Sequence, residues 1–226
     1  GTYISGSYGG RGENGYNHIP NNGPCYGSIL APTNLGSGGS SSPGGGAIIF
    51  NVSGMFRHDG LMTADSRSVY HATGSGGSIF LTVGDLKGVG TISANAGGEG
   101  HSPGGGGRVS LVVTNPGADF AEFTGPVRAF GGADLTGNAG YAGAGTVYHQ
   151  RWADSHGRGR VTVHNNNFYN GRYTDLPPKL HSVPGEAERA SFHVSSSARL
   201  FLTNDYVLGD IYLETSNSWL DLNFKT

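Results

Sequence analysis

Three segments of the chain each begin with paired glycines and then alternate apolar side chains with other residues. They span 45–52, 76–83 and 106–113, and a shorter copy lies at 144–148. Aligned, the four copies place at one position Ile48, Ile79, Val109 and Val147, at intervals of 31, 30 and 38 residues. A unit of about 30 residues cannot bury an apolar face alone, so such units stack on one another. The pattern predicts an array of similar units.

A second short segment of the same kind follows each of the three, at 60–64, 90–94 and 125–129. Because alternation with a period of two buries one face of a strand, we expect two strands per unit. The sequence predicts an all-β fold, a right-handed parallel β-solenoid (β-helix) with long Gly-rich loops. A β-sandwich is the alternative, and a two-residue Asp-Gly hairpin turn would favour it. The strand before Asp59-Gly60 is too distant for such a turn.

Glycine separates two parts of the chain, since 37 of the 42 glycines lie in 1–150 and the other five in 151–226. No helical apolar stripe runs uninterrupted by Gly or Pro in either part. We therefore expect Gly-rich solenoid units in 1–150 and continuing strand-rich coils in 151–226, within one continuous domain. An Asn- and Pro-rich loop at 165–189 interrupts the second part.

Composition excludes several function classes. Charged residues make up 13% of the chain and the formal net charge is −2, so we expect no nucleic-acid partner. The glycines at 104–107 lack the Lys-Ser/Thr and helix of a phosphate-binding loop, which argues against a nucleotide. No run of 18 apolar residues occurs, so we expect no membrane insertion. The single cysteine, Cys25, excludes an internal disulfide and a cysteine-based zinc site.

Four stretches carry a family resemblance: Tyr26–Gly39, Gly44–Ile49, Gly90–Gly98 and Gly104–Ser110. Over about residues 3–150 the chain resembles the Gly-rich parallel β-helix modules of large secreted and cell-surface, adhesin-like bacterial proteins. The resemblance implies an extracellular or cell-surface location and a structural or adhesive role. It implies no catalytic residues and no cofactor.

The carboxylates and histidines do not form a recognisable catalytic or metal motif. In the alignment Asp65 matches Asn95, so acids do not stack between units, although loops could gather Asp119, Glu122 and Asp134. We expect no enzyme activity, and a carbohydrate-active β-helix protein (a polysaccharide lyase or hydrolase, or a glycan-binding module) is the alternative. The nine histidines lack metal-ligand spacing. Calcium bound by loop carbonyls stays open, with no site assigned.

Two groups of apolar side chains are candidate contact sites. Exposed aromatics beside Gly and Asn could stack on glycans or bury in a surface receptor, or fill gaps beneath loops. These candidates are Tyr8, Tyr16, Tyr26, Phe168, Tyr169 and Tyr173.

The last strand-like segment has no polar cap, so we expect the chain to stack end to end with itself as a filament or to continue into further coils of a parent protein. Its candidate contact residues are Trp219, Leu220, Leu222 and Phe224.

Overall fold

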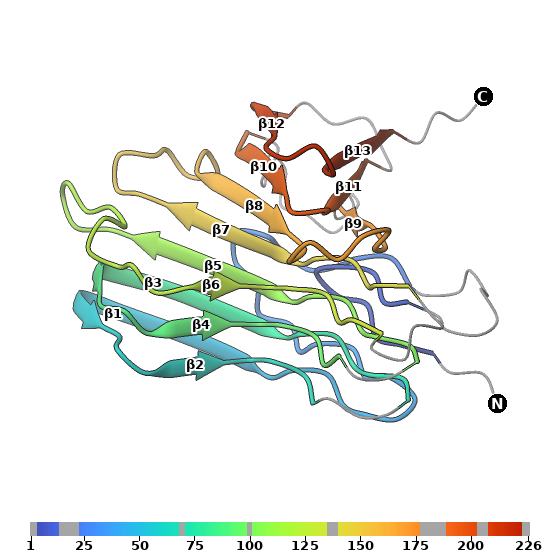
Figure 1. Ribbon diagram of the computed structural model, residues 1–226. Coiled ribbons are helices and arrows are strands. Elements are labelled where there is room, and N and C mark those ends of the chain that lie inside the picture. Colours follow the sequence, from blue (N-terminus) through green and yellow to red (C-terminus); the bar gives the residue numbers. More distant parts are fainter. Residues whose placement is uncertain are drawn as a thin grey trace.

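The computed structural model describes residues 4–13, 23–67, 71–98, 101–134, 140–176, 189–202 and 208–222. Throughout these ranges every regular element is a β-strand, which confirms the all-β class (Figure 1). The strands are β1 (Ala47–Arg57), β2 (Leu61–Thr63), β3 (Ser78–Lys87), β4 (Thr91–Ser93), β5 (Arg108–Val113), β6 (Val127–Arg128), β7 (Thr146–Gln150), β8 (Arg160–His164), β9 (Thr174–Asp175), β10 (Ser191–Ser195), β11 (Arg199–Leu202), β12 (Ile211–Leu213) and β13 (Trp219–Leu222).

The largest sheet has the order β1-β3-β5-β7-β8-β10-β12, so strands of successive segments lie side by side (Figure 1). From β1 to β7 all neighbours are parallel. Their register joins Ile48 to Ile79, Ile79 to Val109 and Val109 to Val147. The alignment read from the sequence is therefore the observed pairing of the strands.

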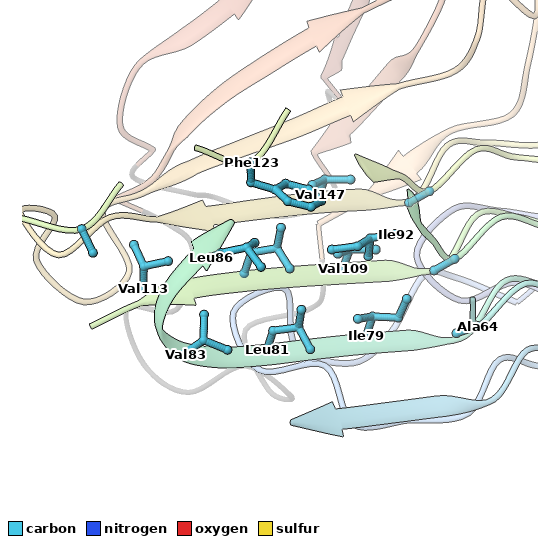
Figure 2. Close-up of a cluster of buried hydrophobic side chains, with 14 residues drawn as sticks. Ala64, Ile79, Leu81, Val83, Leu86, Ile92, Val109, Val113, Phe123 and Val147 are labelled. Atoms are coloured by element: carbon cyan, nitrogen blue, oxygen red, sulfur yellow. The ribbon is translucent and has the colours of Figure 1, made fainter. Parts of the chain in front are cut away.

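A second parallel sheet, β2-β4-β6, faces the first four strands of the large sheet. Met62 pairs with Ile92 and Ile92 with Val127, again as the alignment predicts. Between the two sheets lies the first core cluster, which contains the predicted ladder of Ile79, Leu81, Val109 and Leu111, all buried. Figure 2 labels Ile79, Leu81 and Val109 of this ladder. Period-two alternation thus placed the core residues correctly.

The paired glycines are required by close contact between neighbouring backbones. A Cβ on Gly77 would overlap the carbonyl oxygen of Gly46, and one on Gly107 would overlap that of Gly77. The N-terminal segment lies against the same region, where Gly9 and Gly10 donate to the Gly106 carbonyl at 2.9 Å. Glycine is the residue that lets a backbone approach another this closely.

One strand pair departs from the parallel pattern expected from the sequence. The loop 151–159 turns the chain back, so β8 pairs with β7 in antiparallel fashion. From β8 to β12 the pairs are parallel again, and a third parallel sheet, β13-β11-β9, joins them. Strand β9 lies inside the segment 165–189 that the sequence predicts as a loop, of which 177–188 are outside the described residues.

After the reversal, the core packs against the other face of the large sheet. Val147 belongs to the first core cluster, whereas the next residue, Tyr148, belongs to the second. In the antiparallel register Val147 pairs with Thr162 and Tyr148 with Val161, and Val161 is also in the second cluster. The second core therefore lies on the opposite face. Thr162 lies on the first face, beyond the last strand of β2-β4-β6.

Candidate functional site

The end of the molecule formed by β1 and β2 is exposed. Strand β1 pairs with β3 on one side only and is an edge of the large sheet. Phe50 continues the buried row of Leu81 and Leu111, yet 44% of its surface is exposed because no strand in the described part of the chain pairs with the other side of β1. Residues 47–56 contain neither a charge nor a proline, the devices that normally keep an edge strand from pairing. A register shift between Val52 and Met55 leaves 47–52 as the regular part of this edge.

Glycines at the same end leave room for a neighbouring backbone. Gly46 occupies the position of Gly77, Gly107 and Gly145 in the following segments. At those three a Cβ would overlap the preceding segment, but at Gly46 it would meet open space. A Cβ on Gly60 would likewise meet open space, whereas one on its counterpart Gly90 would overlap the carbonyl oxygen of Gly60. This end therefore keeps the close-packing glycines without a backbone packed on them.

The opposite end is formed by β12 and β13, each of which is an edge strand. Leu213 pairs with buried Val194 and continues the row of the second core, and half of its surface is exposed. Of the predicted contact strand, Trp219 and Leu222 are exposed, while Leu220 is half-buried against the second core. Arg199 lies over the Trp219 ring, 5.8 Å from its centre. Phe224 lies outside the described residues.

Among the predicted aromatic contact residues, Tyr8 is not at the surface, so its expected exposure is wrong. Tyr8 is fully buried, and its hydroxyl shares a hydrogen bond of 2.6 Å with Ser78 Oγ. Burial raises the pKa of Tyr8. Its ring lies 4.8 Å from that of half-buried Tyr26, whose hydroxyl is 2.9 Å from Ser37 Oγ. These two tyrosines fix the N-terminal segment against β3.

The remaining aromatic candidates have separate surroundings. Tyr169 is exposed, and Phe168 stacks on Tyr141 with 5.0 Å between ring centres. Tyr173 lies 4.3 Å beneath the Arg199 guanidinium, which donates to its hydroxyl at 2.9 Å. Tyr16 is outside the described residues. The structure brings Tyr8 and Tyr26 together, whereas Phe168 and Tyr173 have different neighbours.

A buried polar cluster beside Tyr8 was not foreseen from the sequence. Arg108, at the start of β5, is fully buried, and its Nε donates to the Tyr26 carbonyl at 2.9 Å. Asp175 in β9 is also buried, and Arg11 donates to it at 2.6 Å. Burial raises the pKa of the neighbouring Cys25 thiol to about 12, which favours the protonated thiol at neutral pH. The cluster ties the N-terminal segment to β5 and β9.

A groove opens where the cover of the large sheet changes face. It has a volume of about 700 Å³, and its floor is formed by Val147, His149, Thr162 and His164 on the first face of β7 and β8. Its walls come from the loop before β6 and from β6 itself. Phe120 contacts the His149 ring edge-on, 4.7 Å between centres. Along β6 and just beyond it, the wall continues with Arg128 and Phe130.

A second hollow of about 480 Å³ extends the groove along β8 and shares Phe120, His149 and Thr162 with the first. Its further lining is mostly charged: Arg151, Asp154, Arg158 and Arg160. The positive charge comes from arginine and not from histidine at neutral pH. Burial, with a smaller effect of Arg160, lowers the pKa of His149 to about 4, and burial also lowers the pKa of His164.

The acids that loops could have gathered have individual partners. Glu122 pairs with Lys87 at 2.7 Å, Asp119 accepts from the Ala121 amide at 2.9 Å, and Asp134 is buried. In the described ranges no three His, Cys, Asp or Glu side chains are grouped so that they could hold a metal ion. Nor do those ranges contain a helix long and apolar enough to cross a membrane.

Comparisons with known proteins add no assignment. No family model, no curated protein and no solved structure matches this chain.

Proposed function

We propose that the chain is a non-catalytic structural and adhesive module of the cell exterior, a right-handed parallel β-solenoid that associates end to end with copies of itself. Parallel pairing of successive segments supports the solenoid over a sandwich of hairpins, because hairpins pair antiparallel. Right-handedness follows the strong preference of strand–crossover–strand connections. The extracellular location rests on the resemblance to adhesin-like β-helix modules.

The observation that carries the proposal is the bare β1–β2 end. Its edge strand offers backbone groups of 47–52 for pairing, the half-exposed Phe50 continues a core row, and Gly46 leaves room for a neighbouring backbone. Covering this end would bury apolar surface at about 25 cal/mol per Å² and satisfy the backbone groups.

The occupant that we propose is the β12–β13 end of a second copy. That end also has a half-exposed residue that continues a core row, Leu213, and adds the exposed rings of Tyr212 and Trp219. Joining two different surfaces gives an open series of copies unless the rotation closes a ring. A net charge of −2 opposes this association only weakly.

Two variants, one at each end, test the proposal. Phe50→Lys and Leu213→Lys each place a charge at an exposed end of a core row, where the lysine stem can reach water. The control is Val89→Lys, at an exposed turn residue. Static light scattering over a concentration series should give a rising mass for the wild type and for Val89→Lys, and a single copy for each end variant.

Mixing the end variants gives the decisive result. Each retains one intact end, so an equimolar mixture of Phe50→Lys and Leu213→Lys should form dimers and nothing larger. If Leu213→Lys alone still dimerises, two β1 edges are pairing with each other and the head-to-tail arrangement is wrong. A wild type that stays a single copy at millimolar concentration contradicts self-association altogether.

A further inference from the structure

The groove on β7 and β8 is a consequence of the strand reversal. On the first face the row from Val147 continues through Thr162 to His193, as the strand pairing shows. The covering sheet β2-β4-β6 ends before this row does. Beyond Val147 the row is polar, and Thr162 lines an open groove.

The two connected hollows have the dimensions of a ligand site. Volumes of about 700 and 480 Å³ lie in the range of natural small-ligand pockets, and the shared residues make one elongated groove. Half-buried rings form the walls: Phe120 packs on His149, and Phe130 lies 5.1 Å from His164. Apolar ring faces beside polar floor groups suit a ligand that has both apolar faces and hydroxyls.

Charge specifies the ligand further. Arg151 is paired with Asp154 at 2.8 Å and Arg160 with Glu214 at 3.2 Å. Arg128 and Arg158 are exposed, and among the described residues no acid forms an ion pair with either. The lining therefore holds an excess of positive charge on a chain whose net charge is −2.

We propose that this groove binds an acidic oligosaccharide, a chain of uronic-acid units. Arg128 and Arg158 would pair with sugar carboxylates, because the guanidinium fork matches a carboxylate in two parallel hydrogen bonds. Phe120 and Phe130 would contact sugar ring faces. Thr162 and Asn166 supply hydrogen-bonding groups for hydroxyls.

We assign binding, and not hydrolysis, to this site. Hydrolysis of a glycosidic bond by the usual route needs two carboxyl groups on either side of the bond. Among the described lining residues the acid is Asp154, which is held by Arg151 through both its carboxylate oxygens. The inference thus adds a ligand class to the module and does not depend on its self-association.

The test is isothermal titration calorimetry with oligogalacturonate against the same oligomer methyl-esterified, which has identical rings and no charge. It is run at a protein concentration where light scattering gives a single copy, so the result does not depend on association. We expect the charged oligomer to bind and rising salt to weaken it, whereas the esterified oligomer should not bind.

Variants locate the contact within the groove. Arg128→Gln and Arg158→Gln should each weaken binding about tenfold and together about a hundredfold. Phe130→Ala should weaken it while leaving the salt dependence unchanged. The control is Arg67→Gln, at an exposed loop position after β2 that does not line the groove, and it should bind like the wild type. Equal thermal melting of all variants shows that they fold.

Four results would overturn the inference. They are no binding of oligogalacturonate, equal binding of its methyl ester, a loss with Arg67→Gln as large as with Arg128→Gln, and tighter binding of an oligothymidylate of the same length. The last would assign the groove to nucleic acid instead.

Discussion

Truncation of one core row at two of its positions tests both the register and the exposed end. Phe50, Leu81 and Leu111 lie side by side on β1, β3 and β5. Leu81 is fully buried, whereas 44% of the Phe50 surface is exposed. The same kind of change, a large side chain to alanine, therefore meets two different environments in one row.

The expected costs follow from burial. Leu81→Ala removes a side chain from a packed core and should lower the free energy of unfolding by about 3–4 kcal/mol, from lost transfer energy and the cavity left behind. A fully buried phenylalanine costs about 3–5 kcal/mol when truncated. Since nearly half of Phe50 is already in water, Phe50→Ala should cost about 2 kcal/mol in the dilute protein.

The assay is urea unfolding followed by circular dichroism, with equal slopes required before the midpoints are compared. In the dilute protein the cost at Leu81 should exceed that at Phe50 by at least 1 kcal/mol. At higher concentration association covers Phe50, so the cost of Phe50→Ala should grow while that of Leu81→Ala stays constant. Equal costs in the dilute protein would contradict the difference in burial between the two residues, and a cost below about 1 kcal/mol would contradict the placement of Leu81 in a packed core.

Two further predictions concern the glycine rows and the groove floor. Gly77→Ala should destabilise the protein several times more than Gly46→Ala, because only the first places a Cβ against a neighbouring backbone. Thermal melts of both variants check this prediction, and equal losses of melting temperature would contradict it. Because burial lowers the folded-state pKa of His149 from 6.5 to about 4, the unfolded chain takes up its proton first as pH falls. The contribution of His149 to the free energy of unfolding should be complete above pH 6.5 and fall by about 3 kcal/mol toward pH 4. Urea midpoints measured across this range should therefore fall less in His149→Gln than in the wild type. An equal fall in the variant would assign the effect to other groups.

The core rows could be predicted from the sequence because the signal is local and recurs. Alternation identifies the inward positions of a strand, and alignment of Ile79 with Val109 fixes which strands are neighbours. The same reasoning could not foresee the reversal between β7 and β8. Alternation is identical in parallel and antiparallel strands, so the direction of β8 is set by the loop 151–159 and its packing.

The candidate groove was missed for the same reason. Its floor combines His149 and His164 from two strands whose relative direction the sequence does not reveal, and its wall comes from β6. Tyr8 was misplaced because its Gly-rich segment has no periodicity that separates buried from exposed positions. The burial of Arg108 could not be predicted, because an arginine at the start of a strand usually points to solvent.

Hydrogen exchange measured at several protein concentrations reports directly on association through the bare sheet end. About every second amide of β1 points away from β3, and in a single copy these amides face water. These amides should become protected as concentration rises, while amides of β5, paired on both sides, exchange at a constant slow rate. If exchange of the β1 amides stays fast at every concentration, the chain does not associate through this end.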